Sequence, residues 1–322
     1  MAFNNHNTKS VDRLTRKVLT MHFLENVSQS DISKELSLSP AKVNRIIRSA
    51  WDEGLVEISL NIGGADAAES EQRLVTESSL HEAILSPSVS SDPVVNFRLV
   101  AETAADYLLD RLRDGDVICV SGGKAISALV EVIKPKRSYN VTVVPATGGV
   151  QGKFFTDVNH LAYTLAEKLG GRSMQLHAPL FADSREDRDI LLEMRACKEV
   201  LELARTADIA LVGIGAVAKG SESYFDLRPM SDEERNKVIA SDCEGEMLAH
   251  LINRHGESSV SSLDDKLVGL TLDDLRKIPL RIGIAASKDK ILPVRSVLNG
   301  GMITTLVSDE ATATSVLEIL KD

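Results

Sequence analysis

The stretch DVICVSGGKAISALVEVIK, residues 116–134, contains the pattern that decides the fold of most of this chain. It opens with a short apolar run that leads into two glycines, and the residues after Lys124 have the apolar spacing of a helix. A buried strand, a glycine turn and a helix in this order are typical of a parallel sheet covered by helices. We therefore expect such a sheet around this segment.

The same alternation of strand and helix continues along the rest of the chain. Two helices, at about 67–84 and 96–113, are expected before the segment. Further strands are expected at 140–149, 173–182, 208–216, 280–287 and 302–310, and further helices at 159–171, 187–207, 293–301 and 311–320. The pattern predicts the α/β class, with a mostly parallel, doubly wound sheet flanked by helices.

Small residues gather where the predicted strands end. In parallel sheets ligands bind at the carboxyl ends of the strands, and glycine lets backbone N–H groups approach an anion. Lys288 and Lys290, which follow a later strand, would add positive charge. The sequence therefore predicts a pocket for an anionic ligand, lined by Ser121, Gly122, Gly123, Lys124, Thr147, Gly148 and Gly149.

Residues 28–54, SQSDISKELSLSPAKVNRIIRSAWDEG, predict two short helices near the amino terminus. Ser28 or Ser30 is expected to cap the first helix, and Ser39, followed by Pro40, to cap the second. Two short helices with a three-residue joint are the signature of a helix-turn-helix, whose second helix enters the major groove of DNA.

The outer face of that second helix is basic although the chain as a whole is acidic. Residues 37–50 contain three basic residues and no acidic one, as phosphate neutralisation requires. Asn44 and Arg45 have the side chains that bind adenine and guanine edges in pairs of hydrogen bonds. The expected DNA-binding residues are Ser39, Lys42, Asn44, Arg45 and Arg48, and residues 54–60 are expected to form a small wing.

Length and composition limit the class of protein. A chain of 322 residues favours two domains, which we place at 1–64, with the helix-turn-helix, and at 65–322, with the predicted sheet and its pocket. The net charge of -10 argues against indiscriminate coating of nucleic acid. Three scattered cysteines and unclustered histidines favour a reducing cytoplasm and no metal site. We expect a cytoplasmic protein without cofactor or membrane segment.

The sequence resembles the SorC family of sugar-responsive bacterial regulators over nearly its whole length. The head resembles theirs across residues 28–60. The blocks that carry the resemblance in the body are ATGGV (146–150), NHLAYTLAEKLGG (159–171), LHAPL (176–180), TADIALVGIGAV (206–217), GLTLDDLRKIPLRIGIA (269–285) and NGGMITTLVSDEATATSVLEIL (299–320). The order and spacing of these blocks make the resemblance specific.

The resemblance implies an effector domain related to sugar-phosphate isomerases and used for sensing. It also implies dimers or tetramers, a pseudo-palindromic operator, and a phosphorylated sugar or polyol that changes operator binding. Carried onto matching positions, the pocket would use the 121–125 loop, 147–149, Glu246 for sugar hydroxyls and Lys290 for the phosphate. Lys168 also matches a recurring family lysine, although a role at the helix surface is equally open.

Two positions depart from the family pattern. Ile126 stands where the family has threonine, and Ala286-Ser287 stand where it has a glycine pair. An unphosphorylated sugar or polyol therefore remains an open alternative.

The function expected from these observations is a transcriptional regulator of a carbohydrate catabolic operon, acting as a repressor or an activator and not as an enzyme. One alternative is an enzyme of the sugar-phosphate isomerase class with an accessory N-terminal domain. Another is a constitutive architectural DNA-binding protein. The helix-turn-helix argues against the enzyme, as does the absence of convergent acid and base residues in the sequence pattern.

Overall fold

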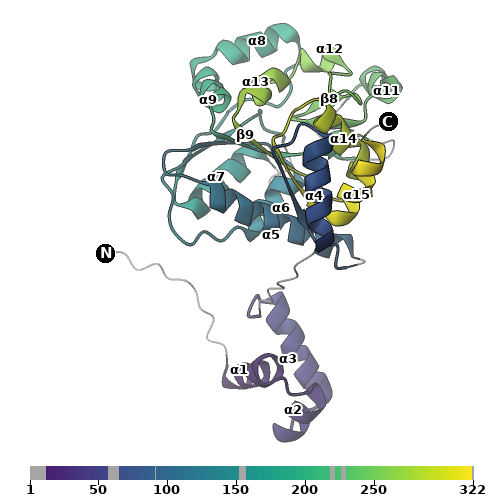
Figure 1. Ribbon diagram of the computed structural model, residues 1–322. Helices are drawn as coiled ribbons and strands as arrows, with labels where there is room; N and C mark the ends of the chain where they lie inside the picture. Colours follow the sequence, from purple (N-terminus) through teal and green to yellow (C-terminus); the bar gives the residue numbers. More distant parts are fainter. Residues whose placement is uncertain are drawn as a thin grey trace. The chain divides into compact units, whose positions relative to one another are not determined.

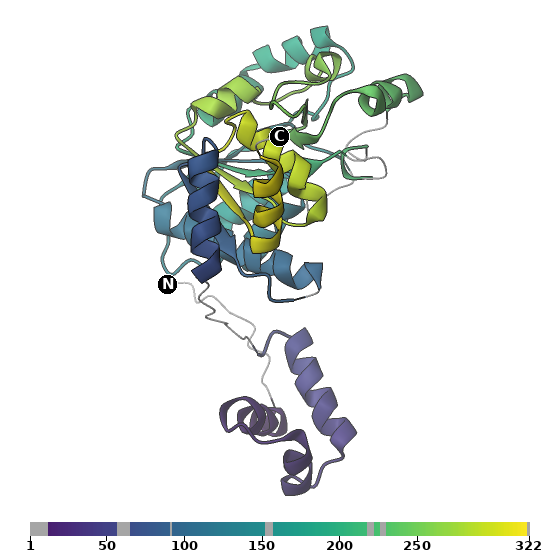
Figure 2. The same ribbon diagram turned by 45° about the vertical axis from the view of Figure 1, so that its right-hand side comes forward.

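The computed structural model describes residues 12–56, 65–90, 92–151, 157–217, 222–225 and 230–320. The chain divides into two compact units, Met1–Gly63 and Gly64–Asp322, which are drawn in Figure 1 and turned by 45° in Figure 2.

The first unit is a small helical domain. Its elements are α1 (Arg13–Leu19), the π-helical turn η1 (Thr20–Leu24), α2 (Gln29–Glu35) and α3 (Pro40–Asp52). Buried apolar side chains from all of these elements form one core, among them Val18, Met21, Ile32, Val43 and Ile47. The first unit therefore has its own hydrophobic core.

The joint between α2 and α3 confirms the helix-turn-helix. Ser37 adopts a positive φ of 53°, and the Leu38 N–H donates to the Ser33 carbonyl at 2.9 Å. This arrangement ends α2 with a tight Schellman turn and lets α3 begin directly after it. The predicted wing lies partly outside the described residues, because residues 57–60 are not described.

The second unit contains a parallel sheet of seven strands in the order β1-β10-β9-β5-β2-β3-β4. The strands are β1 (Glu82–Ser86), β2 (Val117–Val120), β3 (Thr142–Pro145), β4 (Arg172–Ser173), β5 (Ile209–Gly213), β9 (Leu280–Ile284) and β10 (Thr305–Asp309). From β2 the chain builds outward through β3 to β4, and then returns to place β5 on the other side of β2. This reversal between β2 and β5 is the topological switch point of a doubly wound sheet, and the expected fold class is confirmed.

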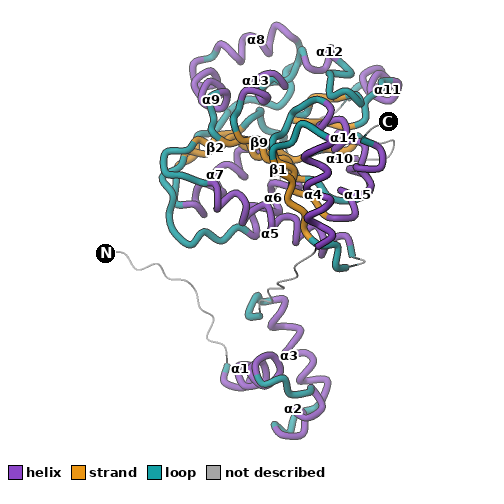
Figure 3. Tube along the Cα trace, viewed as in Figure 1, coloured by secondary structure: helices purple, strands orange, loops and turns teal. Residues whose placement is uncertain are grey.

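Helices cover both faces of this sheet (Figures 1 and 3). One face packs against α5 (Pro93–Arg111), α6 (Lys124–Val132) and α7 (Val158–Leu169). The other packs against α4 (Ala65–Glu77), α9 (Arg195–Arg205), α13 (Leu272–Lys277), α14 (Ile291–Asn299) and α15 (Glu310–Ile319). Residues alternate between the faces along each strand: Ile209 and Leu211 contribute to the first core, Ala210 and Val212 to the second.

A smaller antiparallel sheet, β6-β7-β8, follows β5. Its strands are β6 (Gly215–Ala216), β7 (Gly245–Met247) and β8 (His250–Ile252). Around it lie α10 (Glu222–Phe225), α11 (Asp232–Ala240) and α12 (Ser261–Asp264), and a third apolar cluster joins the sheet to α11 and α12. The sequence pattern gave no indication of this sheet.

Three expectations for local structure are wrong. The expected helix 67–84 ends at Glu77, and residues 82–86 form β1, which pairs with β10 from the far end of the chain. Of the strand expected at 173–182, only Ser173 lies in a strand. The helix expected at 187–207 is broken at Met194, whose ψ is 126°, between α8 (Arg185–Glu193) and α9. In each case contacts distant in sequence, or a single backbone angle, override local periodicity.

Candidate functional site

Helix α3 presents the five expected DNA-binding residues to solvent. The Ser39 hydroxyl accepts the Lys42 N–H at 3.2 Å and so caps the helix, and Pro40 occupies the first turn as expected. Val43, Ile47 and Ala50 are buried on the opposite face. The exposed residues are Ser39, Lys42, Asn44, Arg45 and Arg48.

The arrangement of these side chains around α3 follows from its period of about 3.6 residues per turn. Arg45 and Arg48 lie near the middle of the exposed face, opposite Val43 and Ile47, and Lys42 and Asn44 lie toward its two edges. The Asn44 amide also approaches the Gln29 side chain of α2 at 3.5 Å. A helix with this cationic face and a polar N-terminal end has the shape and charge to enter a major groove.

A second group of expected residues meets at the switch point of the parallel sheet. Ser121 follows β2, and its buried hydroxyl accepts the N–H of Gly213 at the end of β5, at 3.1 Å. The Ser121 N–H donates to the Leu211 carbonyl at 3.0 Å. Ser121 therefore joins the ends of the two strands where ligands bind in doubly wound sheets.

The loop after Ser121 delivers the N-terminus of α6 to this point. Gly123 has φ 104° and ψ 174°, and no side chain caps the helix. The amides of its first turn can therefore serve an anion, with the helix dipole in its favour. The Lys124 side chain is exposed, whereas Ile126 is fully buried in the core between α6 and the sheet. The departure from the family at Ile126 therefore affects packing and not the surface of the pocket.

Glu246 lies over Gly215, two residues beyond the end of β5. It pairs with Gly215 in the small sheet, and one of its carboxylate oxygens accepts the Ala249 N–H at 2.9 Å. Burial raises the pKa of Glu246, and the Ala249 N–H and the charges of Lys290 and His250 act in the opposite direction. The structure therefore brings Glu246 to the end of β5, within electrostatic range of Lys290.

Lys290 ends a 3-10 turn, η3 (Lys288–Lys290), that follows β9, the other neighbour of β5. Its ammonium lies 3.7 Å from the Asp289 carboxylate, which also accepts the Ser287 hydroxyl. Ser287 has φ 109° and ψ 160°, close to the conformation of Gly123 and in the region that favours glycine. The sequence gave no signal for Asp289, which places a negative charge beside the expected phosphate lysine.

The loop Thr147-Gly148-Gly149 lies after β3 and was expected to line the pocket for an anionic ligand. Its glycine amides instead donate to carbonyl groups of the chain. The Gly148 N–H donates to the Val268 carbonyl at 2.8 Å, and the Gly149 N–H donates to the Ala178 carbonyl at 2.9 Å. A β-carbon on Gly148 would lie 2.1 Å from the Pro179 carbonyl oxygen. These glycines allow close packing of neighbouring segments, and their amides are not available to an anion. Thr147 is buried beside them.

Lys168 also has a structural partner. It lies near the end of α7, and its ammonium donates to the Glu131 carbonyl in the last turn of α6 at 2.7 Å. This contact satisfies a carbonyl that helix geometry leaves without an intrahelical partner. The helix-surface alternative for Lys168 therefore fits its position.

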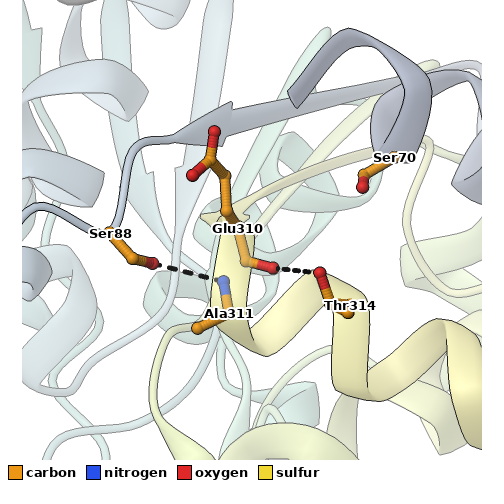
Figure 4. A pocket seen from close by; sticks show the side chains of 5 residues that line it. All are labelled: Ser70, Ser88, Glu310, Ala311 and Thr314. Atoms are coloured by element: carbon orange, nitrogen blue, oxygen red, sulfur yellow. Dashed lines mark hydrogen bonds between the residues drawn. The ribbon is translucent and has the colours of Figure 1, made fainter. Parts of the chain in front are cut away.

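A separate hollow of about 260 Å³ lies at the β1–β10 side of the sheet (Figure 4). It is lined by Ser70, Ser88, Glu310, Ala311 and Thr314. Ser88 accepts the Ala311 N–H at 3.2 Å, and Thr314 donates to the Glu310 carbonyl at 2.8 Å. Its visible polar contacts cap and brace α15, and none of the residues expected in the effector pocket lines it. We place the candidate ligand site at the switch point instead.

Within the described ranges, no three His, Cys, Asp or Glu side chains are grouped so as to hold a metal ion. No described helix has both the length and the apolar character needed to cross a bilayer.

Comparison with known proteins agrees with this division of roles. A family model of sugar-binding domains (Sugar-bind) matches residues 65–318, and a model of winged helix-turn-helix DNA-binding domains matches residues 25–57. The erythritol catabolism regulatory protein EryD of Brucella abortus (strain 2308) is 25% identical over 311 residues, which are 95% of this chain and 96% of that protein.

The sorbitol operon regulator of Klebsiella pneumoniae is 27% identical over 313 residues, covering 95% of this chain and 98% of that protein. The crystal structure of full-length SorC from Klebsiella pneumoniae aligns with a TM-score of 0.74 at 25% identity, covering 95% of this chain and 98% of that one. With a helix-turn-helix followed by a sugar-binding domain that spans most of its length, this chain belongs to the SorC family of DNA-binding transcriptional regulators.

Proposed function

We propose that this chain controls a carbohydrate catabolic operon by coupling the occupancy of a sugar or polyol site in residues 65–322 to operator binding by residues 1–64. The observation that carries the proposal is the convergence at the switch point of the Ser121 loop, Glu246 over Gly215, and Lys290. A carboxylate suits sugar hydroxyls, and an uncapped helix start with a lysine suits a phosphate.

The chemistry of this site favours a polyhydroxylated effector. Glu246 supplies acceptors and Ser121 a hydroxyl, and the first turn of α6 and the Lys290 ammonium supply donors and positive charge. We infer that the effector is a phosphorylated sugar or polyol of the type that the names of the erythritol and sorbitol regulators suggest. Unphosphorylated compounds belong in the test for two reasons. Asp289 places a negative charge beside Lys290, and Ser287 holds a backbone conformation that favours glycine, the residue that the family has there.

For DNA, we propose that Arg45 and Asn44 contact base edges and that Ser39, Lys42 and Arg48 contact phosphates. All five lie on the exposed face of α3 or at its start. Two heads of a homodimer or homotetramer would engage two half-sites of a pseudo-palindromic operator. The effector would then shift the population between arrangements of the oligomer that differ in operator affinity. In this proposal the chain acts in the cytoplasm, where it binds DNA and the effector and does not convert the effector chemically.

A thermal-shift screen of the full chain against erythritol, sorbitol and their monophosphates tests the sensing proposal. A compound that binds only the folded state raises the melting temperature by mass action. Each compound that raises the melting temperature is then titrated into a complex of the full chain with fluorescent DNA from upstream of the gene that encodes it. Fluorescence anisotropy measures the affinity of the chain for this DNA. A stabilising compound that changes operator affinity supports the proposal. A compound that stabilises the protein and leaves operator affinity unchanged overturns the coupling.

A further inference from the structure

His250, on β8, is a buried histidine with a hydrogen-bonding partner at each ring nitrogen. Only 5% of the residue is exposed. Its Nδ1 lies 2.9 Å from a carboxylate oxygen of Asp264 at the end of α12, and its Nε2 lies 3.0 Å from the Leu270 carbonyl oxygen. The other carboxylate oxygen of Asp264 accepts the Ser258 hydroxyl.

These partners decide the protonation of the ring. A carbonyl oxygen has only lone pairs, so Nε2 must carry a proton to make the contact with Leu270. Nδ1 lies against the Asp264 carboxylate, and a hydrogen bond to a carboxylate favours a proton on Nδ1 as well. With protons on both nitrogens, His250 would be an imidazolium paired with Asp264 in a buried position.

The two partners of His250 lie at the two ends of one segment, residues 264–270. Between them, the Val268 carbonyl accepts the Gly148 N–H at 2.8 Å, and Gly269 forms a bridge with Thr147. The Leu270 N–H donates to the Ala146 carbonyl at 2.9 Å. The segment that His250 holds is therefore the one that packs along the loop after β3.

On its other side, His250 belongs to the hairpin that carries Glu246. It pairs with Met247, and the two residues between the strands, Leu248 and Ala249, have φ values of 53° and 65°. A two-residue turn with both φ angles positive is ordinarily made with Asn and Gly, and other residues are strained there. The Ala249 N–H in this strained turn is the donor to Glu246. The hairpin therefore needs contacts outside itself to keep this shape.

We propose that His250, as an imidazolium, is a positioning residue of the effector site, which fixes the β7–β8 hairpin and its Glu246 to the segment 264–270 that holds the Thr147 loop. That the site so positioned receives the effector rests on the proposed function. The charged groups that act on this assembly are Asp264 from α12, Glu246 from β7, and Lys290 from η3 through Glu246.

The proposal has a pH dependence with a definite sign. Burial acts to lower the pKa of His250, but the hydrogen bond and charge of Asp264, the Leu270 carbonyl and the charge of Glu246 outweigh it, and the net pKa is raised. The contribution of this contact is therefore fully present just below the ordinary histidine pKa of about 6.5 and is lost as the pH rises through the raised pKa of His250.

Hydrogen exchange on the full chain without any effector tests this proposal, so its failure is distinguishable from failure of the proposed function. The variant is His250→Gln, which keeps hydrogen-bonding groups and removes the charge. The control is His255→Gln, which changes an exposed histidine five residues along the chain. The probes are the amides of Ala249 and Gly148, the donors to Glu246 and Val268. After correction for intrinsic rates, we expect both amides to exchange about tenfold faster in His250→Gln and unchanged in His255→Gln.

The same two amides should lose protection together in the wild-type protein as the imidazole signal of His250, followed by NMR, titrates. If His250→Gln proves too unstable to purify, Asp264→Asn gives the same readout, with the His250 titration moved to lower pH. A His250 that is already neutral at pH 6, or a Gly148 amide that stays protected when the Ala249 amide opens, overturns the proposal.

Discussion

The carboxylate of Glu246 lies against the α-carbon of Gly215. A β-carbon on Gly215 would lie 2.0 Å from Oε1, 2.3 Å from Cγ and 2.5 Å from Cδ of that side chain. These distances are shorter than any van der Waals contact, so no other residue at 215 leaves Glu246 where it is. Because Gly215 lies only two residues beyond the end of β5, this contact places the carboxylate beside the switch point of the sheet.

Replacing Gly215 with alanine should therefore displace Glu246 and weaken effector binding. We expect at least a tenfold loss of affinity, about 1.4 kcal/mol, for the compound that the thermal-shift screen identifies. Gly213→Ala is the matched control, because its β-carbon would meet only the Ala125 β-carbon at 3.4 Å. Isothermal titration calorimetry measures both. Wild-type effector affinity in Gly215→Ala would remove Glu246 from the site.

Arg45→Ala should weaken specific operator binding by about 10- to 100-fold, because one bidentate contact to a base contributes about 1–3 kcal/mol of discrimination. Effector affinity should be unchanged. Arg98→Ala in α5 removes the same charge from an exposed position outside the first unit and serves as the control. Fluorescence anisotropy measures the affinity of each variant for operator DNA and for scrambled DNA. An equal loss of affinity for both sequences would reassign Arg45 to phosphate binding.

Ser39 separates helix capping from DNA contact. Ser39→Ala removes the acceptor of the Lys42 N–H and should lower the free energy of unfolding of the first unit by about 1 kcal/mol. Ser39→Asp keeps an N-cap and the stability, but it brings negative charge to the phosphate face and should weaken DNA binding more. The only tryptophan of the chain, Trp51, lies in α3, so its fluorescence reports the unfolding of this unit. Operator binding by Ser39→Asp at the wild-type level would place α3 elsewhere than in the groove.

Ser287→Gly should stabilise the second unit by about 1 kcal/mol. The φ of 109° strains serine and not glycine, and this relief exceeds the entropy that glycine adds to the unfolded chain. Ser287→Ala keeps the strain and should give no such gain. Chemical denaturation followed by circular dichroism compares the two. A gain of the same size in both variants would mean that the hydroxyl and not the backbone is unfavourable.

The contribution of His250 to stability should decrease as the pH rises. A histidine whose pKa is raised on folding stabilises the folded state fully below its unfolded pKa of about 6.5, and this contribution is lost as the pH passes through the raised value. The raised pKa of Glu246 changes stability with pH in the same direction in both proteins. The difference in free energy of unfolding between wild type and His250→Gln should therefore be larger at pH 6 than at pH 9. A difference that grows with pH would contradict the ion pair.

Local sequence patterns determined the helix-turn-helix and the architecture of the sheet. The caps Ser28 and Ser39, the proline after Ser39 and the apolar face of α3 are properties of a few adjacent residues, so they can be read without a structure. The alternation of apolar strands, glycine turns and helices likewise specifies a parallel sheet, because such strands must be buried on both faces.

Which residues meet was decided only by the tertiary structure. Strand β1 exists because residues 82–86 pair with residues 305–309, and Gly148 is a glycine because Pro179 packs against it. The contact of Glu246 with Gly215, the glycine-like backbone of Ser287 and the contact of His250 with Asp264 depend in the same way on packing and burial. Propensity and periodicity act over a few neighbouring residues, whereas these contacts join segments that only the folded chain brings together.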